Sequence, residues 1–80
     1  MQETEALIPA VEIDLFADVV QDAISLAVQG RLSDGYTGLL VGVEHALEMH
    51  VAGEPWAREL LDRWRAACVD YAQTFGVALS

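Results

Sequence analysis

Apolar and polar side chains recur along this chain with the period of an α-helix, and the first segment to show it runs from residue 11 to residue 30. At about 100° per residue its polar side chains fall on one narrow stripe. They are Asp14, Asp18, Gln21, Asp22, Ser25 and Gln29. The apolar arc covers roughly 200° of the circumference, about twice the width that packing on a single neighbour requires. This segment is therefore predicted to be a helix with two packing partners.

A second helix is predicted over residues 36–52. Its apolar face holds Tyr36, Leu39, Leu40, Val43, Ala46, Leu47, His50 and Val51, whereas Thr37, Glu44, His45 and Glu48 point away from it. Between the two faces lie Gly38, Gly42 and Met49. A helical glycine costs roughly 1 kcal/mol relative to alanine. The two glycines therefore suggest a close crossing with a neighbouring backbone.

A third helix is predicted over residues 55–75, with Pro55 in its first turn and Glu54 as a candidate N-cap. Its apolar stripe consists of Trp56, Ala57, Leu60, Leu61, Trp64, Ala67, Cys68, Tyr71, Ala72 and Phe75. On its opposite face, Arg58 with Asp62 and Glu59 with Arg63 have the spacing of ion pairs.

The links between the helices are short and carry the expected end signals. Gly30, Gly53 and Gly76 are placed to end the three helices. Ser33 or Asp34 is expected to cap the start of the second helix.

Three helices joined by tight turns predict an all-α fold, a three-helix antiparallel bundle. Its 80 residues suffice for a single domain, expected over 11–76 with a flexible N-terminal lead-in at 1–10 and a short tail at 77–80. One cysteine cannot form an internal disulfide, and the small core is marginal on its own. We expect the core to be completed by dimerisation. The expected interface comprises Leu15, Val20, Ile24, Gly38, Gly42 and Met49.

Composition strengthens the expectation of a partner. Hydrophobic residues make up 54% of the chain, above the usual share of about 45 to 50%. Thirteen acidic residues against four arginines give a net charge of −9, which repels phosphate backbones and anionic lipid heads. Direct nucleic-acid and membrane binding are therefore not expected. No signal peptide and no apolar run of about 20 residues is recognised, so a cytoplasmic location is expected.

The polar stripe of the first helix carries an acidic ridge, Asp14, Asp18 and Asp22, at four-residue spacing. Like charges so placed repel each other by a few tenths of a kcal/mol per pair. The ridge therefore either faces water or meets a basic protein partner or a cation.

The segment GVEHALEMHVAG, residues 42–53, holds the densest cluster of groups that could do chemistry. His45 and His50 are separated by about 140° around a helix, so they cannot share one ion within a chain. Glu44, His45 and Glu48 share a face and could supply part of a metal site across a dimer, or simply a solvated surface. No cofactor is predicted.

His50 lies on the predicted apolar face of the second helix. A buried imidazole there needs a hydrogen-bond partner, for which Tyr36, Tyr71 and a carboxylate across an interface are candidates. A structural role and a pH-sensitive or ligand-contacting role both remain open. Cys68, inside the apolar stripe of the third helix, is expected to be a small buried hydrophobe.

No phosphate-binding loop or nucleophile motif can be read in the chain. The sequence predicts a small acidic interaction or assembly module, a homodimer without catalysis of its own. The alternative is a ligand- or metal-binding bundle that uses His50 with aromatic side chains, or Glu44, His45 and Glu48 across a dimer. A third hypothesis is an acidic decoy for a basic, nucleic-acid-binding surface.

Overall fold

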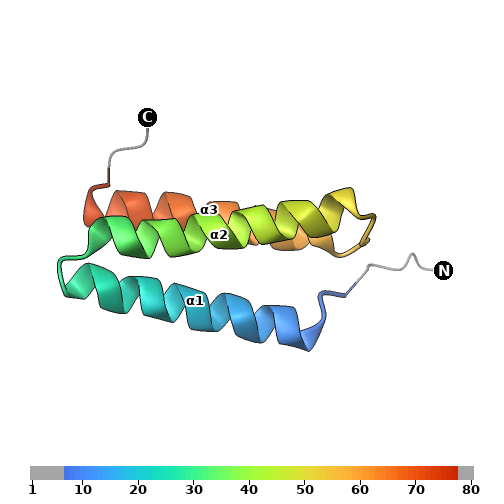
Figure 1. Cartoon of the computed structure of the whole chain (residues 1–80), viewed down its shortest axis with the longest axis horizontal. Coiled ribbons are helices and arrows are strands. Elements are labelled where there is room, and N and C mark those ends of the chain that lie inside the picture. Colours follow the sequence, from blue (N-terminus) through green and yellow to red (C-terminus); the bar gives the residue numbers. More distant parts are fainter. Residues whose placement is uncertain (1–6, 78–80) are drawn as a thin grey trace.

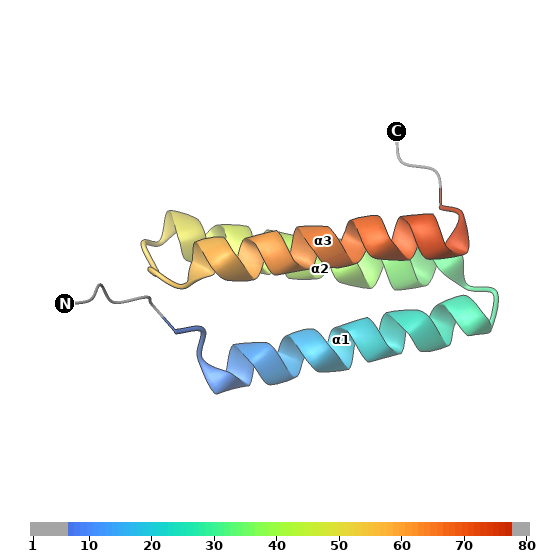
Figure 2. The same ribbon diagram turned by 180° about the vertical axis from the view of Figure 1, so that it is seen from behind.

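The computed structural model describes residues 7–77, which form three antiparallel helices: α1 (Ala10–Val28), α2 (Leu32–Val51) and α3 (Ala57–Phe75). α1 and α3 run in the same direction, with α2 antiparallel to both (Figures 1 and 2). The predicted all-α three-helix antiparallel bundle is confirmed. Of the expected lead-in at 1–10 and tail at 77–80, residues 1–6 and 78–80 lie outside the described residues. No helix within 7–77 is long and apolar enough to cross a membrane.

A glycine closely follows the end of each helix, as the sequence indicates. Gly30, Gly53 and Gly76 have φ angles of 84°, 95° and 76°, a left-handed conformation that side chains with a Cβ disfavour. After α1, the Arg31 N–H donates to the Leu26 carbonyl at 2.8 Å. This is the six-residue bond of a Schellman motif, and it redirects the chain into a short link.

The start of α2 differs from the prediction. The helix begins at Leu32, four residues early, and its N-cap residue Arg31 makes no side-chain capping bond. The carboxylate of Asp34 pairs with the Arg31 side chain at 2.9 Å. Neither Ser33 nor Asp34 therefore caps this helix.

The start of α3 lies two residues later than predicted, at Ala57. Pro55 and Trp56 form a turn before it. Glu54 takes part through its backbone, whose carbonyl accepts the Ala57 N–H at 3.1 Å, and no side-chain capping bond is made at the start of α3.

The core centres on α3. Trp64, Leu60 and Leu39 are its largest fully buried side chains. The Trp64 ring meets Phe16 of α1 edge-on, with ring centroids 4.7 Å apart. The apolar stripe predicted for α3 is confirmed, since seven of its ten members are buried and the other three pack against the core.

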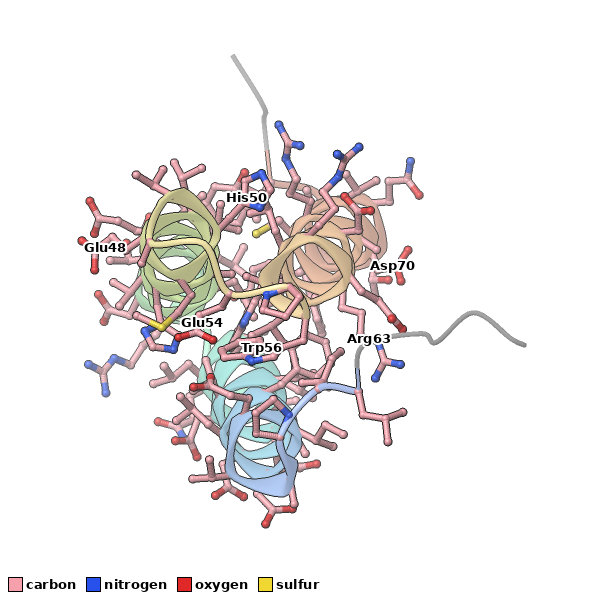
Figure 3. The ribbon with its side chains drawn as sticks, turned by 90° about the vertical axis from the view of Figure 1, so that its right-hand side faces the viewer. Glu48, His50, Glu54, Trp56, Arg63 and Asp70 are labelled. Atoms are coloured by element: carbon pink, nitrogen blue, oxygen red, sulfur yellow. The ribbon has the colours of Figure 1, made fainter. Side chains whose placement is uncertain are left out.

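The three helices do not pack equally. α2 packs extensively on α3 and on α1, whereas α1 touches α3 at only a few positions. The end-on view places the helices at the corners of a triangle (Figure 3). The side between α1 and α3 is the least closed, and the candidate site lies there.

Candidate functional site

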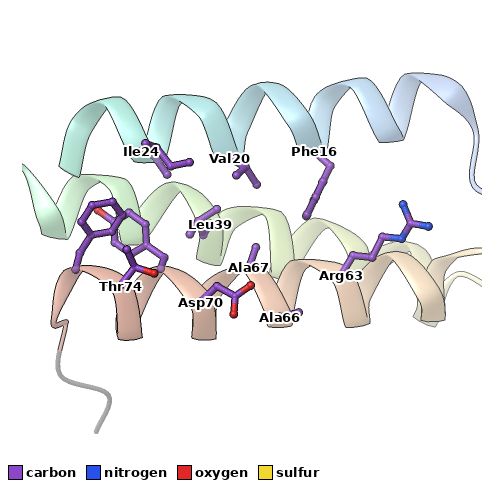
Figure 4. Close-up of a pocket in the computed structure, with 12 residues that line it drawn as sticks. Phe16, Val20, Ile24, Leu39, Arg63, Ala66, Ala67, Asp70 and Thr74 are labelled. Atoms are coloured by element: carbon purple, nitrogen blue, oxygen red, sulfur yellow. The ribbon is translucent and has the colours of Figure 1, made fainter. Parts of the chain in front are cut away.

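An apolar groove of about 690 Å³ lies between α1 and α3, with α2 as its floor (Figure 4). Its lining is overwhelmingly apolar. It consists of Phe16, Val20, Ala23 and Ile24 from α1, Leu39 from α2, and Arg63, Ala66, Ala67, Asp70, Tyr71, Thr74 and Phe75 from α3. Phe16, Val20 and Ile24 project from α1 toward α3 across this space. The α1 wall arises because these three side chains recur at four-residue spacing along one helix face.

The α1 wall continues as an exposed apolar strip. Ile13, Ile24 and Val28 are 41%, 40% and 78% exposed. At about 100° per residue they lie on one side of Val20, about 20° to 80° around the helix from it. The single chain therefore leaves the second packing side of α1 uncovered, as its wide apolar arc implies.

The expected interface residues do not form one surface. Val20 and Ile24 both line the groove. Leu15 is 43% exposed but lies about 180° around α1 from Ile24. Met49 is half-buried, and none of Leu15, Gly38 or Met49 lines the groove.

The predicted close crossing occurs at one of the two glycines. Gly42 is buried against the Trp64 ring, so the neighbour is a side chain of the same chain. A methyl group at Gly38 would meet nothing within 4 Å. Gly35, which the sequence did not single out, is a second close approach, because its Cα faces the Ala23 carbonyl and the Tyr71 hydroxyl.

Two side chains of opposite charge mark the α3 rim of the groove. Arg63 and Asp70 both project from α3 on the side away from α2 (Figure 3). Arg63 pairs with Glu59 at 3.1 Å, and the second predicted pair, Arg58 with Asp62, is also present at 3.7 Å. Ala66 and Ala67 lie between Arg63 and Asp70 on the same wall. The α3 rim thus has small side chains in its middle and a charged side chain on either side of them.

Tyr71 also lines the groove, and its hydroxyl donates to the Leu32 carbonyl at 2.9 Å. The Tyr71 ring is buried and stacks on Tyr36, with centroids 6.2 Å apart. Burial, and secondly the negative charge of Asp34, raise the pKa of this hydroxyl. It therefore acts as a neutral structural donor that joins α3 to the start of α2.

The prediction that His50 is buried is wrong. His50 is exposed, at the end of α2 (Figure 3). The buried face of α2 is formed by Gly35, Leu39, Gly42 and Ala46. Tyr36 and Tyr71 stack on each other, and the Tyr71 hydroxyl donates to the Leu32 carbonyl instead of to His50.

His45, and not His50, makes a hydrogen-bonding contact between helices in the described part of the chain. Its Nε2 lies 2.9 Å from Oε1 of Glu12 on α1, so the expectation that His45 faces solvent is wrong. Glu44 and Glu48 are exposed. Within residues 7–77, no three His, Cys, Asp or Glu side chains are grouped so that they could hold a metal ion.

The remaining reactive and charged groups lie outside the groove. Cys68 is buried and free, and burial raises the pKa of its thiol, so the thiol is protonated near neutral pH. Asp14, Asp18 and Asp22 are exposed, as predicted for the polar stripe of α1. The Trp64 indole N–H is buried and has no acceptor among the described residues.

Comparison with protein-family models, with curated proteins and with solved structures gives no match. The apolar groove between α1 and α3 is a surface of this chain that a partner or a ligand could fill.

Proposed function

We propose that this chain is a small helical interaction or assembly module, without catalysis of its own, that completes its core with a helix from a second chain. The observation that carries the proposal is the groove between α1 and α3, walled by Phe16, Val20 and Ile24 and open to solvent. Fully burying a side chain such as valine or isoleucine stabilises an assembly by about 1.5 to 3 kcal/mol. A micromolar complex needs about 8 kcal/mol net, and association costs at least about 4 kcal/mol of entropy, so roughly four to eight such side chains must be buried across the interface.

Homodimerisation is the form that we favour. A dimer would cover the strip of Ile13, Ile24 and Val28 together with the groove. The acidic ridge of α1 would stay in water. A cytoplasmic location is part of the proposal, supported by a single cysteine that is buried and free.

A second candidate is the binding of an apolar small molecule in the same groove. Its volume of about 690 Å³ lies within the range of about 300 to 1,000 Å³ that is typical of ligand pockets. The aromatic contacts would come from Phe16, Tyr71 and Phe75, since His50 does not line the groove.

Light scattering from low micromolar to about 100 µM protein tests the first proposal. The wild-type chain should show two chains per particle, and Ile24→Glu should reduce this to one because the dimer would bury its charge. Ile24 is 40% exposed, so the variant should keep the helical circular-dichroism spectrum.

Val41→Glu is the matched control, because Val41 is 57% exposed and does not line the groove. It should associate like wild type. A folded wild-type monomer throughout the concentration range would contradict the proposal. In that case, a thermal shift on adding an apolar fluorescent dye, lost in Val20→Glu, would favour the small-molecule candidate.

A further inference from the structure

The α3 rim of the groove carries a charge pattern that is complementary to itself. Arg63 comes three residues before Ala66, and Asp70 comes three residues after Ala67. All four residues line the groove. When two copies of such a helix cross antiparallel, residues equidistant from the crossing point on either side meet, as in any two-fold symmetric interface.

We propose that the occupant of the groove is α3 of a second copy, which crosses α3 antiparallel about a two-fold axis at Ala66 and Ala67. This rests on the assembly function proposed above and specifies its partner and geometry. Arg63 of each copy then faces Asp70 of the other, so the axis generates two ion pairs from one pair of residues. A helix of unrelated sequence would not be matched in this way.

The shape of the wall fits the same arrangement. Ala66 is exposed and Ala67 half-buried, and small side chains at a crossing point let two helices approach closely. The charged side chains flank this point and stay at the rim, where charges cost little desolvation.

The direction of the helices also fits. α1 and α3 are parallel, so the α3 helix of the second copy lies antiparallel to both walls of the groove. It would cover Val20 and Ile24 of α1 as well as Ala66 and Ala67 of α3. The exposed sides of α1 and α3 are thereby buried by one element, and the four helices α1, α3 and their symmetry mates form a closed bundle.

The acidic ridge does not oppose this docking. Asp18, at its centre, lies about 120° around α1 from Ile24. It therefore points away from the groove. The net charge of −9 is carried largely on surfaces that the dimer leaves in water.

Two charge reversals test the geometry in the full-length chain. Arg63→Asp places Asp opposite Asp at both symmetric positions, and Asp70→Arg places Arg opposite Arg. Each variant should weaken dimerisation roughly tenfold or more in sedimentation experiments. An equimolar mixture of the two variants should recover wild-type affinity, because the heterodimer has opposite charges at both positions.

Arg65→Asp is the matched control, since Arg65 is exposed on α3 but does not line the groove. It should dimerise like wild type. Asp70→Arg is informative by itself because it makes the chain less negative. General charge repulsion between copies predicts tighter association for this variant, whereas the reciprocal pairing predicts weaker association.

The outcomes separate the two proposals. If the wild-type chain dimerises but both single variants dimerise equally well, or the mixture shows no recovery, the crossing at Ala66 and Ala67 is wrong while the assembly function stands. Dimerisation abolished instead by charges at Leu40 and Leu47 would place the interface on α2. A monomeric wild type would overturn both proposals.

Discussion

The indole ring of Trp64 lies directly against the backbone of Gly42, where α3 packs on α2. A methyl group at Gly42 would overlap the ring, whereas one at Gly38, a turn earlier on the same helix, would meet nothing within 4 Å. Trp64 is 1% exposed and also packs on Phe16. It has no room to move aside.

Gly42→Ala should therefore lower the free energy of unfolding by about 1 to 3 kcal/mol, because overpacking outweighs the gain in helix propensity. Gly38→Ala should raise it by about 0.5 to 1 kcal/mol, because only the propensity changes. Urea denaturation followed by circular dichroism, at one fixed protein concentration, measures both. If both substitutions changed the free energy of unfolding in the same direction, the α2–α3 crossing would not be as described.

The Glu12–His45 pair joins the first turn of α1 to α2. The two side chains are 16% and 34% exposed and 2.9 Å apart. Removing either by alanine should destabilise the chain by about 1 kcal/mol. In a double-mutant cycle, the free energy of unfolding lost by the double mutant should be smaller than the sum of the two single losses by about 0.5 kcal/mol or more. Strictly additive losses would mean that the pair contributes nothing to the attachment of α1.

The Tyr71 hydroxyl should make stability depend on pH in the alkaline range. Its pKa is raised by burial and by Asp34, so the folded state holds this proton more tightly than the unfolded state, whose pKa is about 10. The contribution to stability is complete below pH 10 or so and is lost as the pH rises through the higher folded pKa.

Tyr71→Phe isolates this effect. At neutral pH the variant should be less stable by about 1 kcal/mol, because the hydrogen bond to the Leu32 carbonyl is lost. Above about pH 10 the difference from wild type should shrink. A difference that stays constant, or grows, over this range would contradict the assigned pKa direction.

A substitution in the acidic ridge tests whether the ridge faces water. Asp18→Lys replaces two repulsive contacts, with Asp14 and Asp22, by two attractive ones at four-residue spacing. It should raise the free energy of unfolding by about 0.5 to 1 kcal/mol at low salt, and by less at high salt. The mass of the assembly should not change. A loss of dimer in this variant would place the ridge in the interface.

The period of apolar residues, with glycine at each helix end, predicts the bundle and the buried stripe of α3. The predicted start of α2 is wrong, because Ser33 and Asp34 are favoured capping residues and Gly35 lowers the helix propensity of the first turn. The turn forms because Gly35 packs against the Ala23 carbonyl and the Tyr71 hydroxyl. Such tertiary contacts outweigh local preference and cannot be read from one segment.

The misplaced histidines have a related cause. Large apolar residues surround most of α2, so hydrophobicity alone does not identify its buried face, and His50 is assigned to the wrong side. The true face is centred on Gly42 and Ala46, because the Trp64 ring requires small neighbours. The pairing of Glu12 with His45 depends on the register of α1 against α2, which an antiparallel hairpin about Gly30 could have indicated.

Part of the groove can be predicted from the sequence. The wide apolar arc of α1 predicts that Val20 and Ile24 face a partner, and the structure places both in the wall between α1 and α3. The spacing of Arg63, Ala66, Ala67 and Asp70 is visible in the sequence. Its meaning emerges only once the fold shows that these residues face the open side of the bundle.

Isotope-filtered nuclear Overhauser spectroscopy on a mixture of ¹³C-labelled and unlabelled protein tests the central claim most directly, because it reports only contacts between copies. We predict contacts between copies from the methyl groups of Ala66 and Ala67 to each other and to Val20 and Ile24. Contacts at Leu40, Leu47 and Val51 instead, or no contacts between copies at about millimolar concentration, would contradict the claim that a second copy fills the groove.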